Sequence, residues 1–252
     1  MAFGLIIIGD EILSGKREDQ HFPKVRGIMA ARGLRLAWVT YLGDERQRIA
    51  DTLARSFASG DIVFSAGGIG ATPDDHTRAA AAEALGVPLR LHPEARELIA
   101  GRMREVNQPL TPERLGMGEF PEGAEIIPNP FNRIPGFSIH RHYFVPGFPV
   151  MAWPMIEWVL DTHYPHLFHS QAEAERSLIV NGLAEGTITP LMVKIEAAYP
   201  GMRVFSLPHM DVEKRLAYRI ELGVKGDPAS IEAAFEQLRA GVLRMGGDIP
   251  PD

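Results

Sequence analysis

The sequence contains no cysteine, no long apolar run and no surplus of basic residues. Without cysteine, disulfide bonds, thiolate zinc sites and a cysteine nucleophile are excluded. No apolar stretch approaches the roughly 20 residues that a membrane-spanning helix requires. The formal net charge is −6, so no basic excess is present to neutralise a nucleic-acid backbone. We therefore expect neither a membrane nor a nucleic acid as a partner.

The N-terminal residues also lack the features of a secretory signal. The apolar run at residues 5–8 is short, has no basic leader before it and is followed directly by Asp10 and Glu11. This run is typical of a buried strand, and we expect a cytoplasmic protein. With 252 residues and 45% hydrophobic content, the chain is long enough to form one large domain or two smaller ones.

Strand and helix patterns alternate along the first part of the chain. Apolar β-branched runs predict strands at residues 5–8, 34–42 and 61–66, and apolar residues at helical spacing predict helices at 19–32, 45–57 and 77–85. The strands lack polar alternation, which is typical of parallel strands covered on both faces. The order predicts right-handed β-α-β units and a parallel sheet between two layers of helices.

The pattern changes after residue 90. A helix is expected at residues 93–106, irregular chain at 109–123, short strands at 125–127, 137–139 and 143–145, and a last helix at 150–160. The final two strands are expected to form a hairpin, which makes the sheet mixed. Pro154 should lie in the first turn of the last helix or kink it.

A domain boundary is expected near residue 165. Beyond it the sequence predicts a strand at 176–180, a helix at 187–199, strands at 202–207 and 216–224, and a helix at 228–245. We therefore expect a three-layer α/β/α domain with a mostly parallel mixed sheet over residues 1–165. A smaller α+β module with the order βαββα follows over residues 166–252.

The segment SAGGIGATPDDHT at residues 65–77 joins a strand to a helix through three glycines. Glycines permit positive φ and close approach to backbone amides, and the following helix presents free N–H groups and the positive end of its dipole. Such a turn can hold a phosphate at the carboxyl end of a strand. For the glycines alone, a simple connecting turn with an aspartate N-cap is an equally good interpretation.

Two adjacent carboxylates, Asp74 and Asp75, favour the functional interpretation. One aspartate suffices as a cap, whereas two beside an anion site would repel the ligand unless one binds Mg²⁺ or another divalent cation, or handles a proton. Arg133 is a second candidate, because a guanidinium can bind phosphate through its planar fork, although an arginine in a surface loop is the commoner case.

At this point the sequence resembles a known family. GGIGATPDDHT at 67–77 is similar to the GGxGPTxDDxT signature of the molybdopterin-binding domain of CinA proteins, a branch of the MoaB/Mog family, and GDEILSG at 9–15 is similar to GDELLxG. PEGAEIIPN at 121–129 resembles PxGAxxxxN, and VPGFP at 145–149 resembles LPGxP. The similarity extends over residues 5–160, and we expect no counterpart here of the amidohydrolase domain of full-length CinA proteins.

The resemblance implies roles for individual residues. Asp75 matches the acidic residue that is essential in Mog-like relatives, and Asp44 matches a second acidic position, although Asp44 alone would be interpreted as an N-cap. We expect Asp44 and Asp75 to be catalytic, and a metal to be held by Asp74 and Asp75. The expected ligand-binding residues are Gly9, Asp10, Glu11, Ser14, Gly67, Gly68, Gly70, Thr72, Thr77, Asn129, Arg133, Pro146 and Gly147.

Three functions follow from the resemblance. The first is binding of molybdopterin or another phosphate-bearing pterin or nucleotide. The second is catalysis, either by a metal-dependent pyrophosphatase acting on ADP-ribose or FAD or by a Mog-like nucleotidyl transferase. The third is a non-enzymatic module with a decayed site, which is suggested because Ala71 replaces the usual proline and Met151 replaces a glutamate. A homodimer or homotrimer is expected by similarity.

Overall fold

The computed structural model describes residues 2–170, 174–209 and 219–250. The chain separates into two compact units, residues 1–170 and 171–252, a few residues beyond the expected boundary at 165. The extra residues pack on the first unit. Leu167 and Phe168 pack against its core, and the backbone N–H of His169 donates a hydrogen bond to the carbonyl of Arg32 at 3.0 Å.

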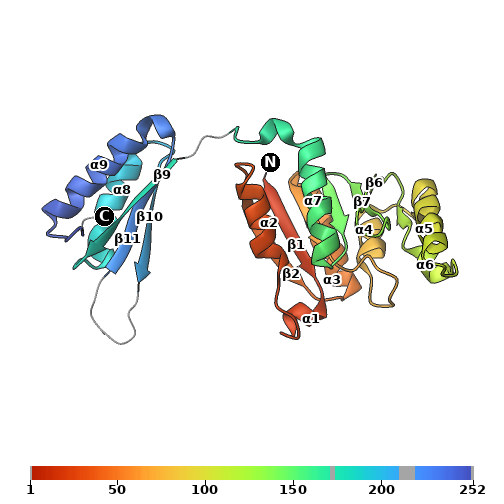
Figure 1. Cartoon of the computed structure of the whole chain (residues 1–252). Helices are drawn as coiled ribbons and strands as arrows, with labels where there is room; N and C mark the ends of the chain where they lie inside the picture. The colour runs from red at the N-terminus through yellow and green to blue at the C-terminus, as the bar shows by residue number, and fades with distance from the viewer. Residues whose placement is uncertain (1, 171–173, 210–218, 251–252) are drawn as a thin grey trace. The chain divides into compact units, whose positions relative to one another are not determined.

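A six-stranded sheet forms the centre of the first unit (Figure 1), with the strand order β2-β1-β3-β8-β7-β6. The strands are β1 (Phe3–Ile8), β2 (Leu36–Leu42), β3 (Ile62–Ala66), β6 (Glu125–Ile127), β7 (Gly136–Ile139) and β8 (His142–Val145). The first four strands in this order run parallel, and β7 is antiparallel to both β8 and β6. The expected mixed, mostly parallel sheet and its hairpin are confirmed.

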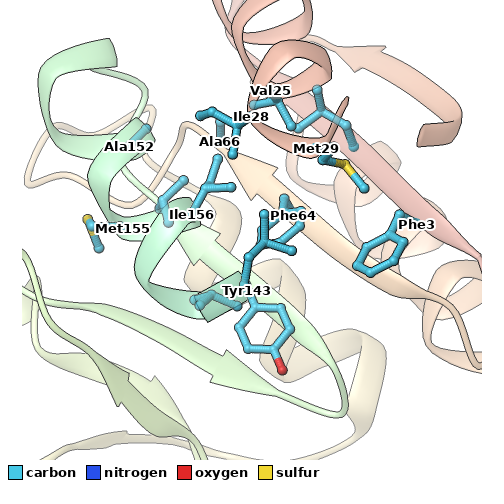
Figure 2. Packing of buried hydrophobic residues seen from close by; sticks show 14 of the residues in the cluster. Phe3, Val25, Ile28, Met29, Phe64, Ala66, Tyr143, Ala152, Met155 and Ile156 are labelled. Carbon is cyan, nitrogen blue, oxygen red and sulfur yellow. The ribbon is translucent and has the colours of Figure 1, made fainter. Parts of the chain in front are cut away.

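Helices cover both faces of this sheet. On one face lie α2 (His21–Ala30) and α7 (Pro149–His163), whose apolar residues pack on Leu5, Ile7 and Phe64. Figure 2 shows part of this core, with Val25 and Met29 of α2 and Ile156 of α7 around Phe64. On the other face lie α3 (Arg46–Ser59) and α4 (Thr77–Leu85), packed on Ile6, Ile8 and Val63. The α/β fold class is therefore confirmed.

Residues 109–123 are more regular than expected. They contain α6 (Pro112–Gly116) and β5 (Glu119–Pro121), and β5 pairs antiparallel with β4 (Leu89–Leu91) before α5 (Pro93–Glu105). The prediction of irregular chain was wrong here, because three-residue strands are too short to give a periodic pattern. A short helix, α1 (Asp10–Leu13), and a 3₁₀ turn at Pro165–Leu167 were also not predicted.

Pro154 lies inside α7 and not in its first turn, because the helix begins at Pro149. Pro149 is the proline with the fixed φ that suits a helix start. Pro154 has no N–H to donate to the preceding turn, so it removes one hydrogen bond from the helix.

The second unit has the predicted βαββα order. Its elements are β9 (Ala174–Asn181), α8 (Glu185–Ala198), β10 (Arg203–His209), β11 (Arg219–Gly226) and α9 (Pro228–Arg244). The sheet order β10-β11-β9 is fully antiparallel, and its core is separate from those of the first unit. Residues 216–218 of the expected third strand of this unit lie outside the described residues.

Within the described residues, no helix combines the length and the apolar character that a membrane crossing requires.

Candidate functional site

The loops that carry most of the candidate residues leave the sheet at one edge. Gly9 and Asp10 follow β1, Asp44 follows β2, Gly67 follows β3, and Pro146-Gly147 follows β8. These four strands are parallel neighbours, so their carboxyl ends, and the loops after them, lie side by side. This edge is where ligands bind in open α/β sheets.

The loop after β3 is held from one side by the first residues of α4. The hydroxyl of Thr77 donates a hydrogen bond to the carbonyl of Gly67 at 3.0 Å, and the N–H of Thr77 donates to the carbonyl of Gly68 at 2.9 Å. The guanidinium of Arg78 donates to the carbonyls of Ile69 and Gly70. Four successive carbonyls therefore point toward the start of α4.

The orientation of these carbonyls determines where the amides point. In a trans peptide the C=O and the following N–H lie in one plane and point in opposite directions, so the amides of residues 68–71 face away from Thr77 and Arg78. Within the part of the chain that the structure describes, these four N–H groups have no protein acceptor. They form a row of free donors at a helix N-terminus, which is the arrangement that binds anions.

The glycines of this loop are required by its own packing. A Cβ at Gly67, where φ is +111°, would lie 2.1 Å from the carbonyl oxygen of Ile8. A Cβ at Gly68 would lie 2.2 Å from the Thr77 hydroxyl, and one at Gly70 would lie 2.6 Å from Asp75. The glycines therefore let the loop fold tightly against β1 and the start of α4.

Asp75 organises the turn that follows the free amides. Its Oδ2 accepts hydrogen bonds from the backbone N–H of Thr72 at 2.8 Å and from the Thr72 hydroxyl. Asp74 is exposed beside it. Asp75 therefore has a structural function in the loop, and its catalytic function remains a prediction.

Asp10 and Asp44, which follow β1 and β2, are joined by two reciprocal hydrogen bonds between backbone and side chain. The N–H of Asp10 donates to Asp44 Oδ2 at 2.8 Å, and the N–H of Asp44 donates to Asp10 Oδ1 at 3.3 Å. Desolvation is the main cause that raises the pKa of Asp44, and the charges of Asp10, Glu11 and Asp74 raise it further, against the lowering effect of the Asp10 N–H. The rise shows that acidic groups from three loops lie close together.

His21 links α2 to the loop after β8. Its Nε2 lies 2.9 Å from the carbonyl oxygen of Gly147, and a Cβ on Gly147 would contact Gly67 at 3.4 Å. Asp19 lies just before α2. Its carboxylate accepts hydrogen bonds from the N–H groups of His21 and Phe22 and from the hydroxyl of Tyr41. These contacts fix one side of the loop cluster.

Of the other predicted ligand residues, Asn129 has partners in its own loop, Arg133 pairs with another element, and Ser14 is exposed. The side chain of Asn129 is buried and bonds to Phe131 N, Asn132 Oδ1 and Ile134 O. The guanidinium of Arg133 pairs with Glu105 at the end of α5. Ser14 is exposed after α1. Within the described residues, none of these three side chains has a hydrogen bond or ion pair with residues 67–77, which we call the glycine loop. Their ligand roles therefore stay predictions.

Sequence reasoning did not identify Arg78 or His21 as residues of this edge. Arg78 is largely buried, and desolvation lowers its pKa although the charges of Asp75 and Glu119 raise it. An arginine three residues after the aspartate pair, at the start of an alanine-rich helix, is the only signal in this segment that could have drawn attention to it. His21 gave no comparable signal, because its partner is 126 residues away.

Two departures from the family pattern have visible consequences. Met151 places its sulfur 3.3 Å from the side-chain nitrogen of Asn132, where relatives are expected to have a carboxylate. Ala71 contributes an N–H that a proline would lack. In the described ranges, no group of three or more His, Asp or Glu side chains is arranged to hold a metal by itself. A divalent cation here needs oxygen ligands from a bound phosphate or water.

The first unit is thus an α/β domain with a mixed, mostly parallel sheet and a glycine-rich turn at the carboxyl edge of that sheet. The family model of the probable molybdopterin-binding domain matches residues 4–168. The chain therefore belongs to this family, and its first unit is a CinA-like molybdopterin-binding-type domain, as the sequence motifs predicted.

Individual relatives agree with this assignment. A CinA-like protein from Anaeromyxobacter sp. (strain K) is 34% identical over 172 residues, which is 66% of this chain and 41% of that protein. The chain thus spans about two fifths of that relative. A protein from Aeropyrum pernix is 27% identical over 254 residues. The alignment covers 97% of this chain and 95% of the Aeropyrum protein. The crystal structure of CinA from Thermoplasma acidophilum has the same fold, with a TM-score of 0.57 and 24% sequence identity. The match covers 63% of this chain and 96% of the Thermoplasma chain.

Proposed function

We propose that the first unit binds a phosphate-bearing pterin, such as molybdopterin, or a nucleotide at the loop of residues 67–77. The observation that carries this proposal is the row of free N–H groups at residues 68–71, fixed by Thr77 and Arg78. Donors that are already oriented lose little entropy on binding and can contact several oxygens of one phosphate. The family description supports a pterin as the organic part.

The carboxylates around the proposed phosphate site make a bound cation necessary as well as the free N–H groups. Asp10, Glu11, Asp44 and Asp74 lie near one another: desolvation is the main cause that raises the pKa of Asp44, and the charges of the other three carboxylates raise it further. A phosphate would be repelled by this group unless a divalent cation such as Mg²⁺ lies between them. We propose that the carboxylates hold the cation together with the phosphate oxygens, and that binding of the ligand depends on the cation.

The same acidic group favours a second candidate, a metal-dependent pyrophosphatase acting on ADP-ribose or FAD. A divalent cation held by these carboxylates together with phosphate oxygens would withdraw charge from the scissile bond and would orient a water molecule. Asp44, whose pKa is raised, is the group best suited to accept a proton from that water. The replacement of the expected carboxylate by Met151 weakens this candidate, so binding is preferred.

Incubation with ADP-ribose or FAD and Mg²⁺ separates the two functions. Binding without turnover gives a higher melting temperature, which is lost when EDTA is added. Turnover releases AMP, and Asp75→Asn abolishes the release while Asp51→Asn, a surface change on α3, does not. If neither compound nor a molybdopterin preparation raises the melting temperature with Mg²⁺ present, the proposal is wrong and a decayed site is indicated.

A further inference from the structure

The two outer edges of the six-stranded sheet are protected very differently. At one edge β6 is three residues long, begins with Glu125 and is followed by Pro128. At the other edge β2 is seven residues long, with the sequence LAWVTYL, and contains no charge, proline or glycine. Among the described residues β2 pairs only with β1, so one row of its backbone groups has no partner strand. Long apolar edge strands of this kind readily pair with another strand.

A groove of about 760 Å³ follows the same edge. One wall is formed by Trp38, Thr40 and Leu42 of β2, and the other by polar residues of α3. Trp38 is fixed, because its ring lies over Gly4, where a Cβ would come within 2.1 Å of it, and its Nε1 donates to Asp61 at 3.0 Å. The groove therefore has one fixed aromatic wall residue and lies beside the edge of β2 that has no partner strand among the described residues.

We propose that this edge is the contact surface between two copies of the chain. The β2 strands pair antiparallel about a two-fold axis, which extends the sheet, and the two α3 helices lie side by side across the groove. A two-fold contact of this type uses the same patch on both subunits. This inference is independent of the ligand proposed above, because the groove lies along β2 and α3 and not at the glycine loop.

The charges on α3 identify the occupant as a second copy. From its N-cap onward the groove side carries Glu45, Arg48, Asp51 and Arg55, an alternation of acid and base. Reversing this order gives base, acid, base, acid. An antiparallel copy therefore places Glu45 opposite Arg55 of the partner subunit, and Arg48 opposite Asp51 of the partner subunit. A protein of unrelated sequence has no reason to match this order.

All four charged side chains are exposed, and Glu45 also caps α3 by accepting hydrogen bonds from the N–H groups of Gln47 and Arg48. The pair of Arg48 with Glu45 is 4.0 Å long and both side chains are more than 60% exposed. Asp51 accepts only an exposed side-chain hydrogen bond from Gln47, and Arg55 donates to Thr52. Exposed interactions of this kind contribute roughly 0–1 kcal/mol, so an interface can replace them at little cost.

Analytical ultracentrifugation of the full chain between about 1 and 100 µM tests the proposal, a range that brackets weak and standard-size interfaces. A dimer of twice 27.8 kDa is expected. Arg48→Glu and Asp51→Arg, each of which places like charges together, should weaken dimerisation about tenfold, and the double swap should restore it. Arg96→Glu, an exposed reversal on α5, is the matched control and should change nothing.

Hydrogen exchange gives a second readout that does not depend on the variants. The amides of residues 36–42 should exchange more slowly as the protein concentration rises, whereas those of 125–127 should not change. A monomer throughout the range, a trimer, a dimer indifferent to both reversals, or a double swap that stays as weak as the single variants would each overturn the proposal.

Discussion

At the scale of single residues, two side chains determine what the glycine loop presents. Thr77 and Arg78 bind the carbonyls of residues 67–70, and the rigid peptide planes turn the amides of residues 68–71 the other way. The free donors are thus a consequence of hydrogen bonds made on the opposite side of the loop. Ala71 contributes the fourth of these donors, at the position where the family signature has proline.

This arrangement predicts a measurable effect at Ala71. Ala71→Pro removes one N–H, and a hydrogen bond to a charged group is worth about 1.5–3 kcal/mol, so affinity for ADP-ribose with Mg²⁺ should fall at least about tenfold. Isothermal titration calorimetry measures the change. Ala71→Gly keeps the N–H and should bind like the wild type. Equal affinities for the proline and glycine variants would show that this amide does not contact the phosphate.

The residue scale also shows what sequence could and could not predict. The glycines and aspartates of residues 67–77 form a contiguous motif, so their place at a strand end was predictable. The role of Arg78 in orienting the loop was not predictable, because its partners are backbone carbonyls whose orientation depends on the folded loop. Asn129 and Arg133 were predicted as ligand residues, but their contacts with Asn132 and Glu105 depend on segments that no local pattern defines.

At the scale of elements, long buried strands and amphipathic helices were predicted closely, whereas short ones were not. The runs that form β1 and β3 are apolar except for Ser65, because helices cover both faces, and this pattern is visible in sequence. The strands β4 and β5 have three residues each and are stabilised by pairing with each other. Their existence depends on a contact between residues about 30 positions apart, roughly the scale at which local patterns lose information.

One buried hydrogen bond joins two elements across the sheet. Nε2 of His142 in β8 lies 2.7 Å from the hydroxyl of Ser56 in α3, and Nδ1 lies 3.0 Å from the carbonyl of His140. A carbonyl cannot donate, so Nδ1 carries the proton and Nε2 accepts from Ser56. Burial is the main cause that lowers the pKa of His142 to about 4.

The lowered pKa predicts how stability depends on pH. The unfolded chain protonates His142 near pH 6.5, whereas the folded chain does so only near 4. The stability from the neutral imidazole is present above pH 6.5 and is lost as the pH falls from there toward 4, by up to about 3 kcal/mol. Urea unfolding at a series of pH values measures this slope. His142→Asn should flatten it, and exposed His166→Asn should not. Identical slopes in all three proteins would contradict the prediction.

At the scale of the whole molecule, the two units have separate cores. The apolar clusters of the first unit draw on residues up to Phe168, and that of the second begins at Ala174. The candidate site lies entirely within the first unit. The family similarity has the same limit, because the model of the molybdopterin-binding domain ends at residue 168.

This division predicts that residues 1–170 fold and bind ligand without the rest. The fragment should show one cooperative urea transition and the same affinity for ADP-ribose with Mg²⁺ as the full chain, within about threefold, since no core residue is removed. Circular dichroism and calorimetry measure the two properties. A fragment that folds but has lost affinity would show that residues 171–252 contribute to the site.

The most direct test of the account follows the backbone amides themselves. In a titration of the full chain with pyrophosphate and Mg²⁺, monitored by amide NMR, the signals of residues 68–71 should shift most, and EDTA should reverse the shifts. Amides along β2 and α3 should stay in place. If the signals of residues 68–71 do not move while pyrophosphate binds elsewhere, the glycine loop is not the phosphate site and the central claim is wrong.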